Sequence, residues 1–75
     1  MKALVEYLAR ALARHPEEVV VIEEQYGDRV VLRLSVDEDD KGRVIGREGR
    51  IANAIRALVH VAATRAGVRA TLDID

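Results

Sequence analysis

The chain has 75 residues, of which 49% are hydrophobic and 33% charged, and these values indicate one small globular domain. A chain this short hides only about 60% of the surface that its unfolded form exposes, so a deep catalytic cleft is not expected. The lack of cysteine excludes a disulfide framework, the lack of an apolar run of about 18 residues argues against a membrane span, and the net charge of −1 argues against a polycation that coats nucleic acid.

The first half of the chain predicts a helix followed by a hairpin. Leucines recur every four residues near the start, and Pro16 directs the residue before it away from the helical region, which predicts a helix over about residues 2–14. Residues 19–24 are rich in β-branched side chains and predict a strand, which a turn at residues 26–28 closes. Residues 29–36 alternate between apolar and polar side chains and predict a second strand, paired with the first.

The second half predicts two helices and a third strand. An acidic run favours the start of a short helix over about residues 37–45, and Gly46 can end that helix with a positive φ angle. Apolar residues at spacings of four and three predict a long helix over about residues 50–66, which Gly67 ends. The alternating residues 68–74 predict the last strand. The order α-β-β-α-α-β predicts an α+β fold with three helices on one face of a three-stranded sheet.

The most informative segment is residues 42–55, GRVIGREGRIANAI, in which glycines at 46 and 49 frame two charged residues between two predicted helices. Glycine corners allow the backbone to approach a phosphate closely, and free NH groups at a helix start supply donors and partial positive charge. Residues 41–56 hold five basic residues and one acidic residue, so a nearly neutral chain carries a local charge of about +4. The segment therefore predicts a phosphate clamp.

The two glycines also allow other interpretations. A GxxG sequence by itself more often marks the end of a helix and a tight turn. The clamp is favoured here by the position between two helices and by the basic residues Arg43, Arg47 and Arg50. A dinucleotide fingerprint and a P-loop do not fit, because Gly42 lies too far from Gly46 and no Lys-Ser/Thr pair follows.

The sequence VIGREGRI at residues 44–51 resembles the signature of KH domains: an apolar pair, GxxG, and a helix with isoleucine. The predicted order of elements is that of the prokaryotic, type II, KH fold. Nearly the whole chain resembles the KhpA family of small bacterial proteins with a single KH domain, through LVEYLARAL, HPEEV and GRVIGREGRIANAIRALV. The resemblance implies that the GxxG loop holds the backbone of about four single-stranded nucleotides while an aliphatic groove receives the bases.

The residues expected to bind RNA fall into three groups. The loop residues supply main-chain donors, the neighbouring arginines supply positive charge, and the flanking aliphatic residues form an apolar wall or, equally well, part of the core. These residues are Arg43, Val44, Ile45, Gly46, Arg47, Glu48, Gly49, Arg50 and Ile51.

Several features predict modest affinity. Glu48 places a negative charge inside the loop, and Asn53 stands where relatives often have a basic residue; both act towards weaker binding. Tyr7 and Tyr26 are the only aromatic residues, so no stacking platform of the RRM or OB kind is expected. With about three phosphate contacts, log affinity should fall with log salt at a slope of roughly −2.

No catalytic residue, cofactor or metal site is expected. The consecutive carboxylates at residues 37–40 should point in different directions, unlike those of a two-metal nuclease. His15 and His60 have no Cys, Asp or second His at ligand spacing in the sequence. An enzyme would also need a nucleophile–base pair and a pocket, and neither is evident.

Two functions remain open. The favoured one is a cytoplasmic, non-enzymatic protein that binds single-stranded RNA as an RNA chaperone or post-transcriptional regulator. The alternative is a KH-fold dimerisation or protein-interaction module with weak RNA binding. For this alternative, the resemblance implies a larger KH protein of the KhpB (Jag) type as a candidate partner.

A homodimer is also expected, on the basis of the long helix. Its apolar positions cover an arc of roughly 200°, whereas one core-facing stripe needs about 100° or a little more. The flank left over is formed by Ala54, Leu58 and Val61, which are spaced to pack against a symmetry mate.

Overall fold

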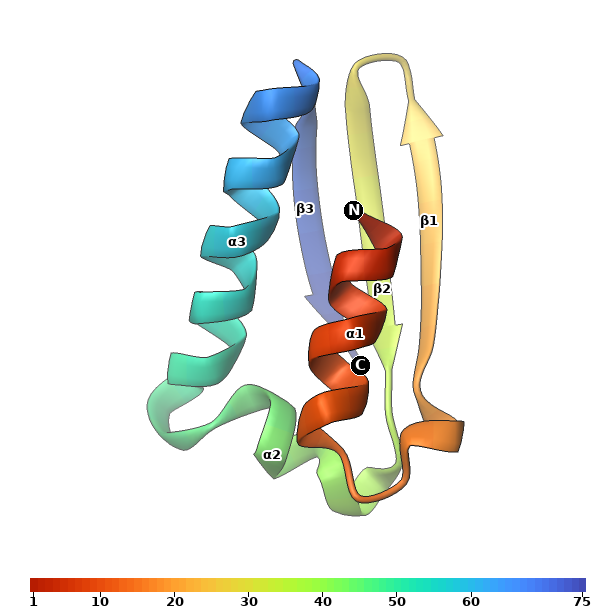
Figure 1. Cartoon of the computed structure of the whole chain (residues 1–75), viewed down its shortest axis with the longest axis vertical. Coiled ribbons are helices and arrows are strands. Elements are labelled where there is room, and N and C mark those ends of the chain that lie inside the picture. The colour runs from red at the N-terminus through yellow and green to blue at the C-terminus, as the bar shows by residue number, and fades with distance from the viewer.

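The computed structural model describes all residues 1–75 as one layer of helices packed on one face of a three-stranded sheet (Figure 1). A 3₁₀ turn at Pro16–Glu18 precedes the first strand, and another at Glu38–Asp40 precedes the second helix. The helices and strands, in chain order, are α1 Lys2–Leu12, β1 Val20–Tyr26, β2 Arg29–Ser35, α2 Lys41–Ile45, α3 Arg50–Ala66 and β3 Arg69–Ile74.

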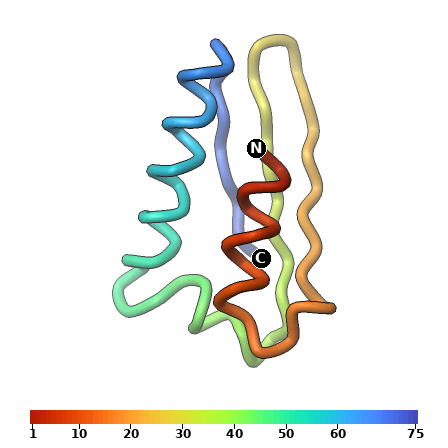
Figure 2. Tube along the Cα trace, in the orientation of Figure 1, coloured from red at the N-terminus to blue at the C-terminus, as the bar shows by residue number.

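The sheet has the order β1-β2-β3, so the middle strand of the sequence is also the middle strand of the sheet. The hairpin strands β1 and β2 are antiparallel, whereas β2 and β3 are parallel. Figure 2 follows the long connection through α2 and α3 that returns the chain for this parallel pairing. The predicted α+β fold with its α-β-β-α-α-β order is confirmed.

The predicted boundaries are correct within two residues, except where irregular backbone replaces regular structure. The first helix ends at Leu12 rather than Arg14, because Ala13 is already extended at φ −80° and ψ 146°. The predicted short helix over residues 37–45 is a 3₁₀ turn followed by α2. The hairpin strands differ slightly from the prediction. β1 begins one residue later and ends two residues later than predicted, and β2 ends one residue earlier than predicted.

The core lies between the sheet and the helices and follows the predicted alternation. Val30, Leu32 and Leu34 point from β2 into the core, while Val36, beyond the end of the strand, is only partly buried. The long helix contributes a single stripe, formed by Ala52, Ile55, Val59 and Ala63. The core therefore uses only one side of α3.

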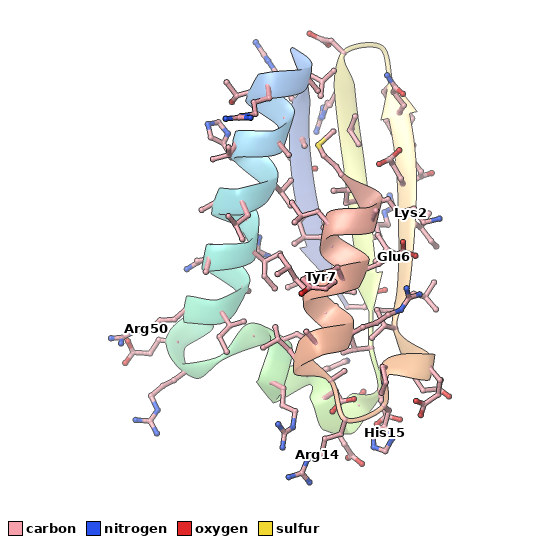
Figure 3. The ribbon with its side chains drawn as sticks, in the orientation of Figure 1. Lys2, Glu6, Tyr7, Arg14, His15 and Arg50 are labelled. Carbon is pink, nitrogen blue, oxygen red and sulfur yellow. The ribbon has the colours of Figure 1, made fainter.

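Asp40 is the only buried charged residue, and its side chain has no exposed surface. Its two carboxylate oxygens accept hydrogen bonds from the main-chain NH groups of Arg14, at 3.0 Å, and His15, at 2.9 Å. The Arg43 side chain lies 4.0 Å from one of these oxygens. Asp40 thus ties the segment after α1 to the start of α2, and Figure 3 shows Arg14 and His15 together at this end of the molecule.

The surroundings of Asp40 favour its charged form. Burial by itself raises the pKa of the Asp40 carboxyl, but the two main-chain hydrogen bonds and the positive charges of His15 and Arg43 outweigh it and lower the pKa below its ordinary value. A carboxyl whose pKa is lower in the folded than in the unfolded chain stabilises the fold above the unfolded pKa. This contribution is lost as the pH falls through the folded pKa.

Replacing Asp40 with asparagine should lower the melting temperature at neutral pH, because a neutral amide cannot accept both NH groups as the carboxylate does. In strong acid the wild type loses the same contribution, so the two melting temperatures should converge. Thermal unfolding followed by circular dichroism across this pH range measures both effects. The exposed neighbour Asp39, replaced by asparagine, is the control and should behave like the wild type. If the melting temperatures of the wild type and the Asp40 variant differ by the same amount at every pH, the stabilising role of the Asp40 carboxylate is contradicted.

Candidate nucleic-acid interface

The loop between α2 and α3 turns on two glycines with positive φ angles. Gly46 has φ 76° and ψ 173°, and Gly49 has φ 76° and ψ 14°. A Cβ atom at position 46 would lie 2.7 Å from Cγ1 and 2.9 Å from the main-chain nitrogen of Ile51. Only glycine fits this corner, because the backbone conformation and the contact with α3 both exclude a side chain.

Two of the four predicted loop donors are already engaged within the protein. The Gly46 NH donates to the Gly42 carbonyl at 2.9 Å, and the Gly49 NH donates to the Gly46 carbonyl at 3.1 Å. These bonds cap α2 and close the loop, leaving Arg47 and Glu48 as the candidate main-chain donors. Glu48 is the only non-glycine residue with a positive φ, at 58°, a conformation that favours glycine, asparagine or aspartate.

The loop arginines differ in how far acidic residues neutralise them. Arg47 is exposed and has no carboxylate within 4.0 Å. Arg50 lies 3.9 Å from the Glu48 carboxylate, with both side chains well exposed, and Figure 3 shows Arg50 reaching outwards from the corner of the loop. The Arg43 side chain lies 4.0 Å from the Asp40 carboxylate, which partly offsets its charge. Arg47 is therefore the most available cation for a phosphate.

The three aliphatic residues around the loop have different roles. Val44 is completely buried, so its assignment to the RNA-contacting wall is corrected to a core position. Ile45 and Ile51 are partly exposed on either side of the loop and keep apolar surface available there. Of the two interpretations, groove wall or core, burial favours the core for Val44 alone.

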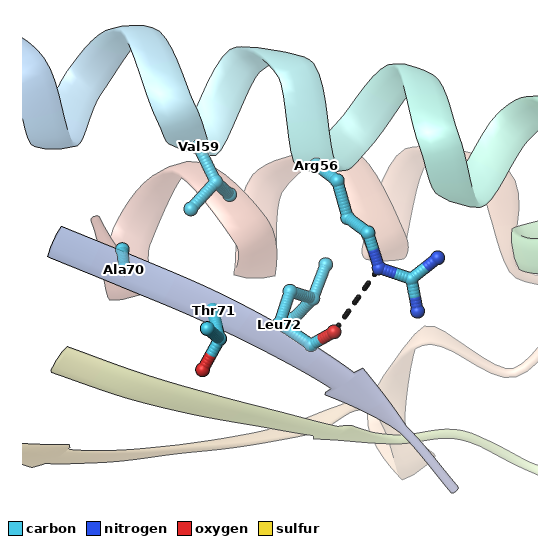
Figure 4. Close-up of a pocket in the computed structure, with 5 residues that line it drawn as sticks. All are labelled: Arg56, Val59, Ala70, Thr71 and Leu72. Carbon is cyan, nitrogen blue, oxygen red and sulfur yellow. Dashed lines mark hydrogen bonds between the residues drawn. The ribbon is translucent and has the colours of Figure 1, made fainter.

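A shallow cavity of about 250 Å³ lies between α3 and β3, in a region that the sequence analysis did not assign (Figure 4). The Arg56 side chain lines this cavity and donates from Nε to the Leu72 carbonyl at 3.1 Å and from Nη1 to the Asn53 side-chain oxygen at 3.3 Å. The order of the elements indicated where this cavity lies. Because β3 follows α3 directly and pairs in parallel with β2, β3 must run beside α3. The lining residues are Arg56, Val59, Ala70, Thr71 and Leu72.

The free edge of β3 adds main-chain polar groups to this groove. The NH groups of Arg69 and Asp75 donate to the Asp28 and Leu34 carbonyls, which lie on the β2 side. Because successive residues of a strand direct their NH and C=O groups to opposite sides, Ala70 and Leu72 direct theirs to the free edge. The bond from Arg56 to the Leu72 carbonyl agrees with this orientation. The groove therefore combines an apolar floor with donors and acceptors along one wall.

One histidine belongs to a cluster of possible metal ligands, which the sequence analysis did not expect. His15, Asp37 and Asp39 each place a possible ligand atom within 4.8 Å of the others, although no aspartate lies near His15 in the sequence. The tertiary structure brings the two segments together through Asp40. The Asp37 side chain already accepts a hydrogen bond from the Asp39 NH at 2.9 Å, as the cap of the 3₁₀ turn.

The flank of α3 predicted to remain uncovered is exposed. Leu58 and Val61 expose 48% and 53% of their surface, and Ala54 is exposed beside them. Tyr7 of α1 is 72% exposed and projects from the neighbouring helix in Figure 3. None of the helices is both long and apolar enough to cross a lipid bilayer.

Comparisons with known proteins give matches over nearly the whole chain. A family model described as "KhpA/KhpB, KH domain" matches residues 2–74. Proteins named RNA-binding protein KhpA from Halalkalibacterium halodurans and Oceanobacillus iheyensis are 49% and 45% identical over 99% of this chain, and the matches span 97% and 99% of their own lengths. The protein of that name from Bacillus subtilis is 35% identical over 99% of this chain and 91% of its own length.

A solved structure of Era, in complex with MgGDPNP and nucleotides 1506–1542 of 16S ribosomal RNA, has a similar fold. It matches with a TM-score of 0.58 and 20% identity, over 97% of this chain and 28% of the Era chain. At this identity the likeness concerns the fold alone. The relatives of higher identity are named for RNA binding rather than for a reaction.

Proposed function

Because the chain belongs to the KhpA/KhpB family of KH domains, we propose that it is a non-enzymatic protein that binds single-stranded RNA, as an RNA chaperone or post-transcriptional regulator in the cytoplasm. In this proposal the GxxG loop clamps the RNA backbone. One phosphate approaches the NH groups of Arg47 and Glu48, and the Arg47 guanidinium provides most of the charge.

The observation that carries the proposal is the continuity of loop and groove. Gly49 leads directly into α3, and the same helix forms one wall of the cavity with Arg56 and Val59. A strand held at the loop can therefore place its next bases over the apolar floor, where the free edge of β3 offers hydrogen bonds to base edges. The Arg56 side chain must move from the Leu72 carbonyl to open this wall, or else pack against the incoming base.

Single-stranded RNA should bind more tightly than duplex RNA of the same sequence, because the groove reads splayed bases and a duplex offers none. Fluorescence anisotropy with a labelled unstructured oligomer and with its annealed duplex measures the difference. For the single strand, a plot of log affinity against log salt concentration should have a slope of roughly −2. Equal affinities for the two forms would exclude a groove of the KH type.

A second proposal concerns self-association through α3. Ala54, Leu58 and Val61 form an exposed apolar flank, which a two-fold dimer would cover. At 100° per residue, Leu58 points about 160° away from Arg56 around the helix axis, so a dimer on this flank leaves the groove open. The same flank is also the proposed surface for a larger KH protein of the KhpB (Jag) type, if the domain acts as an interaction module.

Replacing Val61 with glutamate should convert a dimer into a folded monomer, because the new charge would be buried in the contact. Sedimentation equilibrium at high micromolar concentration measures the change in mass. His60, an exposed α3 residue that points about 160° away from Leu58 around the helix axis, can be replaced by glutamate as the control. A wild type that sediments as a monomer would refute the dimer.

A further inference from the structure

One face of the sheet is not covered by any other part of the chain. All the helices lie on the opposite face, as Figure 1 shows. Val30, Leu32 and Leu34 point from β2 into the core, so strand alternation directs the residues between them to the uncovered side, which we call the open face. By the strand register, the open face carries Val20, Ile22, Glu24 and Tyr26 from β1, Arg29, Val31, Arg33 and Ser35 from β2, and Arg69, Thr71, Asp73 and Asp75 from the last part of the chain.

An apolar stripe runs along β1 on the open face. Val20, Ile22 and Tyr26 expose 51%, 52% and 58% of their surface, although all three are large hydrophobic residues. Because β1 pairs only with β2, the stripe lies at an edge of the sheet, and its neighbour Val31 on β2 is also partly exposed. Exposed apolar surface on an edge strand is typical of a site that another protein surface covers. We call Val20, Ile22 and Tyr26 the β1 stripe.

The charges of the open face are separated along the strands. Arg29 and Arg69 lie at the hairpin end, directly opposite each other in the register, whereas Asp73 and Asp75 lie towards the other end. None of these four side chains has an opposite charge within 4.0 Å. Two arginines that face each other across neighbouring strands destabilise a sheet unless a negative charge lies over them. The open face therefore has a positive end and a negative end.

The middle of the open face carries no net charge. Nη2 of Arg33 lies 3.4 Å from Oε1 of Glu24, and the Tyr26 hydroxyl donates to the other oxygen of that carboxylate at 3.3 Å. The Glu24 Oε1 atom is already buried in the single chain, so covering this pair removes little further hydration. Asp28 lies in the turn beyond the last strand pair. It lowers, but does not cancel, the positive charge of the two arginines beside it.

A two-fold axis that runs across the strands makes this pattern complementary to itself. Such an axis, lying between two open faces, reverses the direction of each strand and keeps it over its own copy. The β1 stripe then packs on the β1 stripe of the second copy, and Arg69 lies over Asp75 of the second copy. A nucleic acid or an anionic bilayer would instead need positive charge over the whole face. The pattern thus favours a second copy of the chain.

We infer that the open face is a contact surface for a second copy of this chain, related by a two-fold axis that runs across the strands. The contact does not depend on the proposed RNA binding. It uses the sheet layer, whereas the proposed α3 contact uses the helix layer, so both contacts can exist together. Strands of six or seven residues, spaced about 4.8 Å apart, give a face of roughly 20 Å by 15 Å. An interface of this size belongs to the weak, transient class.

Sedimentation equilibrium of the Val61→Glu variant tests this contact in the absence of the α3 contact. As the concentration rises to about the millimolar range, the average mass should rise from that of a monomer towards that of a dimer. Adding Val20→Thr and Ile22→Thr, which keep the β-branched side chains that strands favour, should weaken the association several-fold. Adding Tyr7→Gln instead is the matched control and should change nothing, because Tyr7 is exposed on α1, away from the open face. A monomer at every concentration, or equal association with and without the threonines, overturns the inference.

Charge reversal in the same Val61→Glu background tests the two-fold geometry. Arg29→Glu with Arg69→Glu makes both ends of the open face negative, and Asp73→Arg with Asp75→Arg makes both ends positive. Each variant alone should associate several-fold more weakly, whereas an equimolar mixture should associate more tightly than the background. All four side chains are exposed, so the circular dichroism spectra should not change.

The two threonine substitutions, added to one member of the mixture, separate a specific contact from attraction between net charges. They should weaken the mixed association several-fold, because the β1 stripe is then missing from one side. If the threonines leave the mixture unchanged, the attraction is one of net charge and the inference is overturned. A mixture that associates no better than either member alone also overturns it.

Discussion

Replacing Arg47 and Glu48 together with aspartate should lower the affinity for single-stranded RNA by about tenfold to a hundredfold. The change removes the most available cation of the loop and puts a second negative charge where the phosphate approaches. Loss of one charge-assisted hydrogen bond costs about 1.5–3 kcal/mol, which corresponds to this range of affinity. The fold should survive, because the loop is exposed and aspartate tolerates the positive φ of position 48 better than glutamate does.

Titration with a labelled oligomer and a circular dichroism spectrum separate these two effects. Glu48→Asp alone is the matched control, since it keeps both the charge of the loop and Arg47, and it should bind as the wild type does. If the double variant keeps its affinity and its spectrum, the loop does not clamp RNA, and binding by this domain must be sought at another surface.

Replacing Gly46 with alanine should destabilise the fold by about 2–6 kcal/mol. A side chain in this region of positive φ and extended ψ costs about 1–3 kcal/mol, and the overlap with Ile51 adds the cost of a forced shift, typically about 1–3 kcal/mol. For a domain of this size the melting temperature should fall by roughly 10 °C or more. RNA binding should weaken as well, because the strain can be relieved only by moving the loop away from the start of α3.

Gly42 provides the control on the same short helix. A Cβ atom there meets no atom within 4 Å, and the residue lies inside α2, so Gly42→Ala should stabilise the domain by about 0.5–1 kcal/mol. Thermal and urea unfolding of both variants give the comparison. Equal stability of the two alanine variants would mean that the corner at position 46 relaxes freely.

The parts of the fold that local sequence determines were predicted closely. The long helix was predicted to its first and last residues, because glycines with positive φ flank it on both sides and its apolar spacing is regular. The positive φ of Gly46 was likewise predicted and is confirmed. Such features depend on residues within one or two turns of each other, which periodicity and turn chemistry describe well.

The features that were missed depend on contacts between distant segments. Asp40 looked like one of four similar carboxylates, and its role became visible only when Arg14, 26 residues away, supplied an NH group. The same contact ends α1 early and brings His15 close to Asp37. The groove beside β3 was missed because its walls come from α3 and from the free edge of a strand, and no local motif marks that edge.

The parallel pairing of β3 with β2 also determines when the groove can exist during folding. The hairpin of β1 and β2 joins neighbouring residues, whereas Arg29 pairs with Arg69, 40 positions later. Closing so long a loop is slower than forming a local hairpin, so β3 docks late, after α3 is available to cover it. A nascent or partly unfolded chain then has the GxxG sequence but lacks one wall of the groove. RNA that fills the groove would hold the last strand in place and select the completely folded chain.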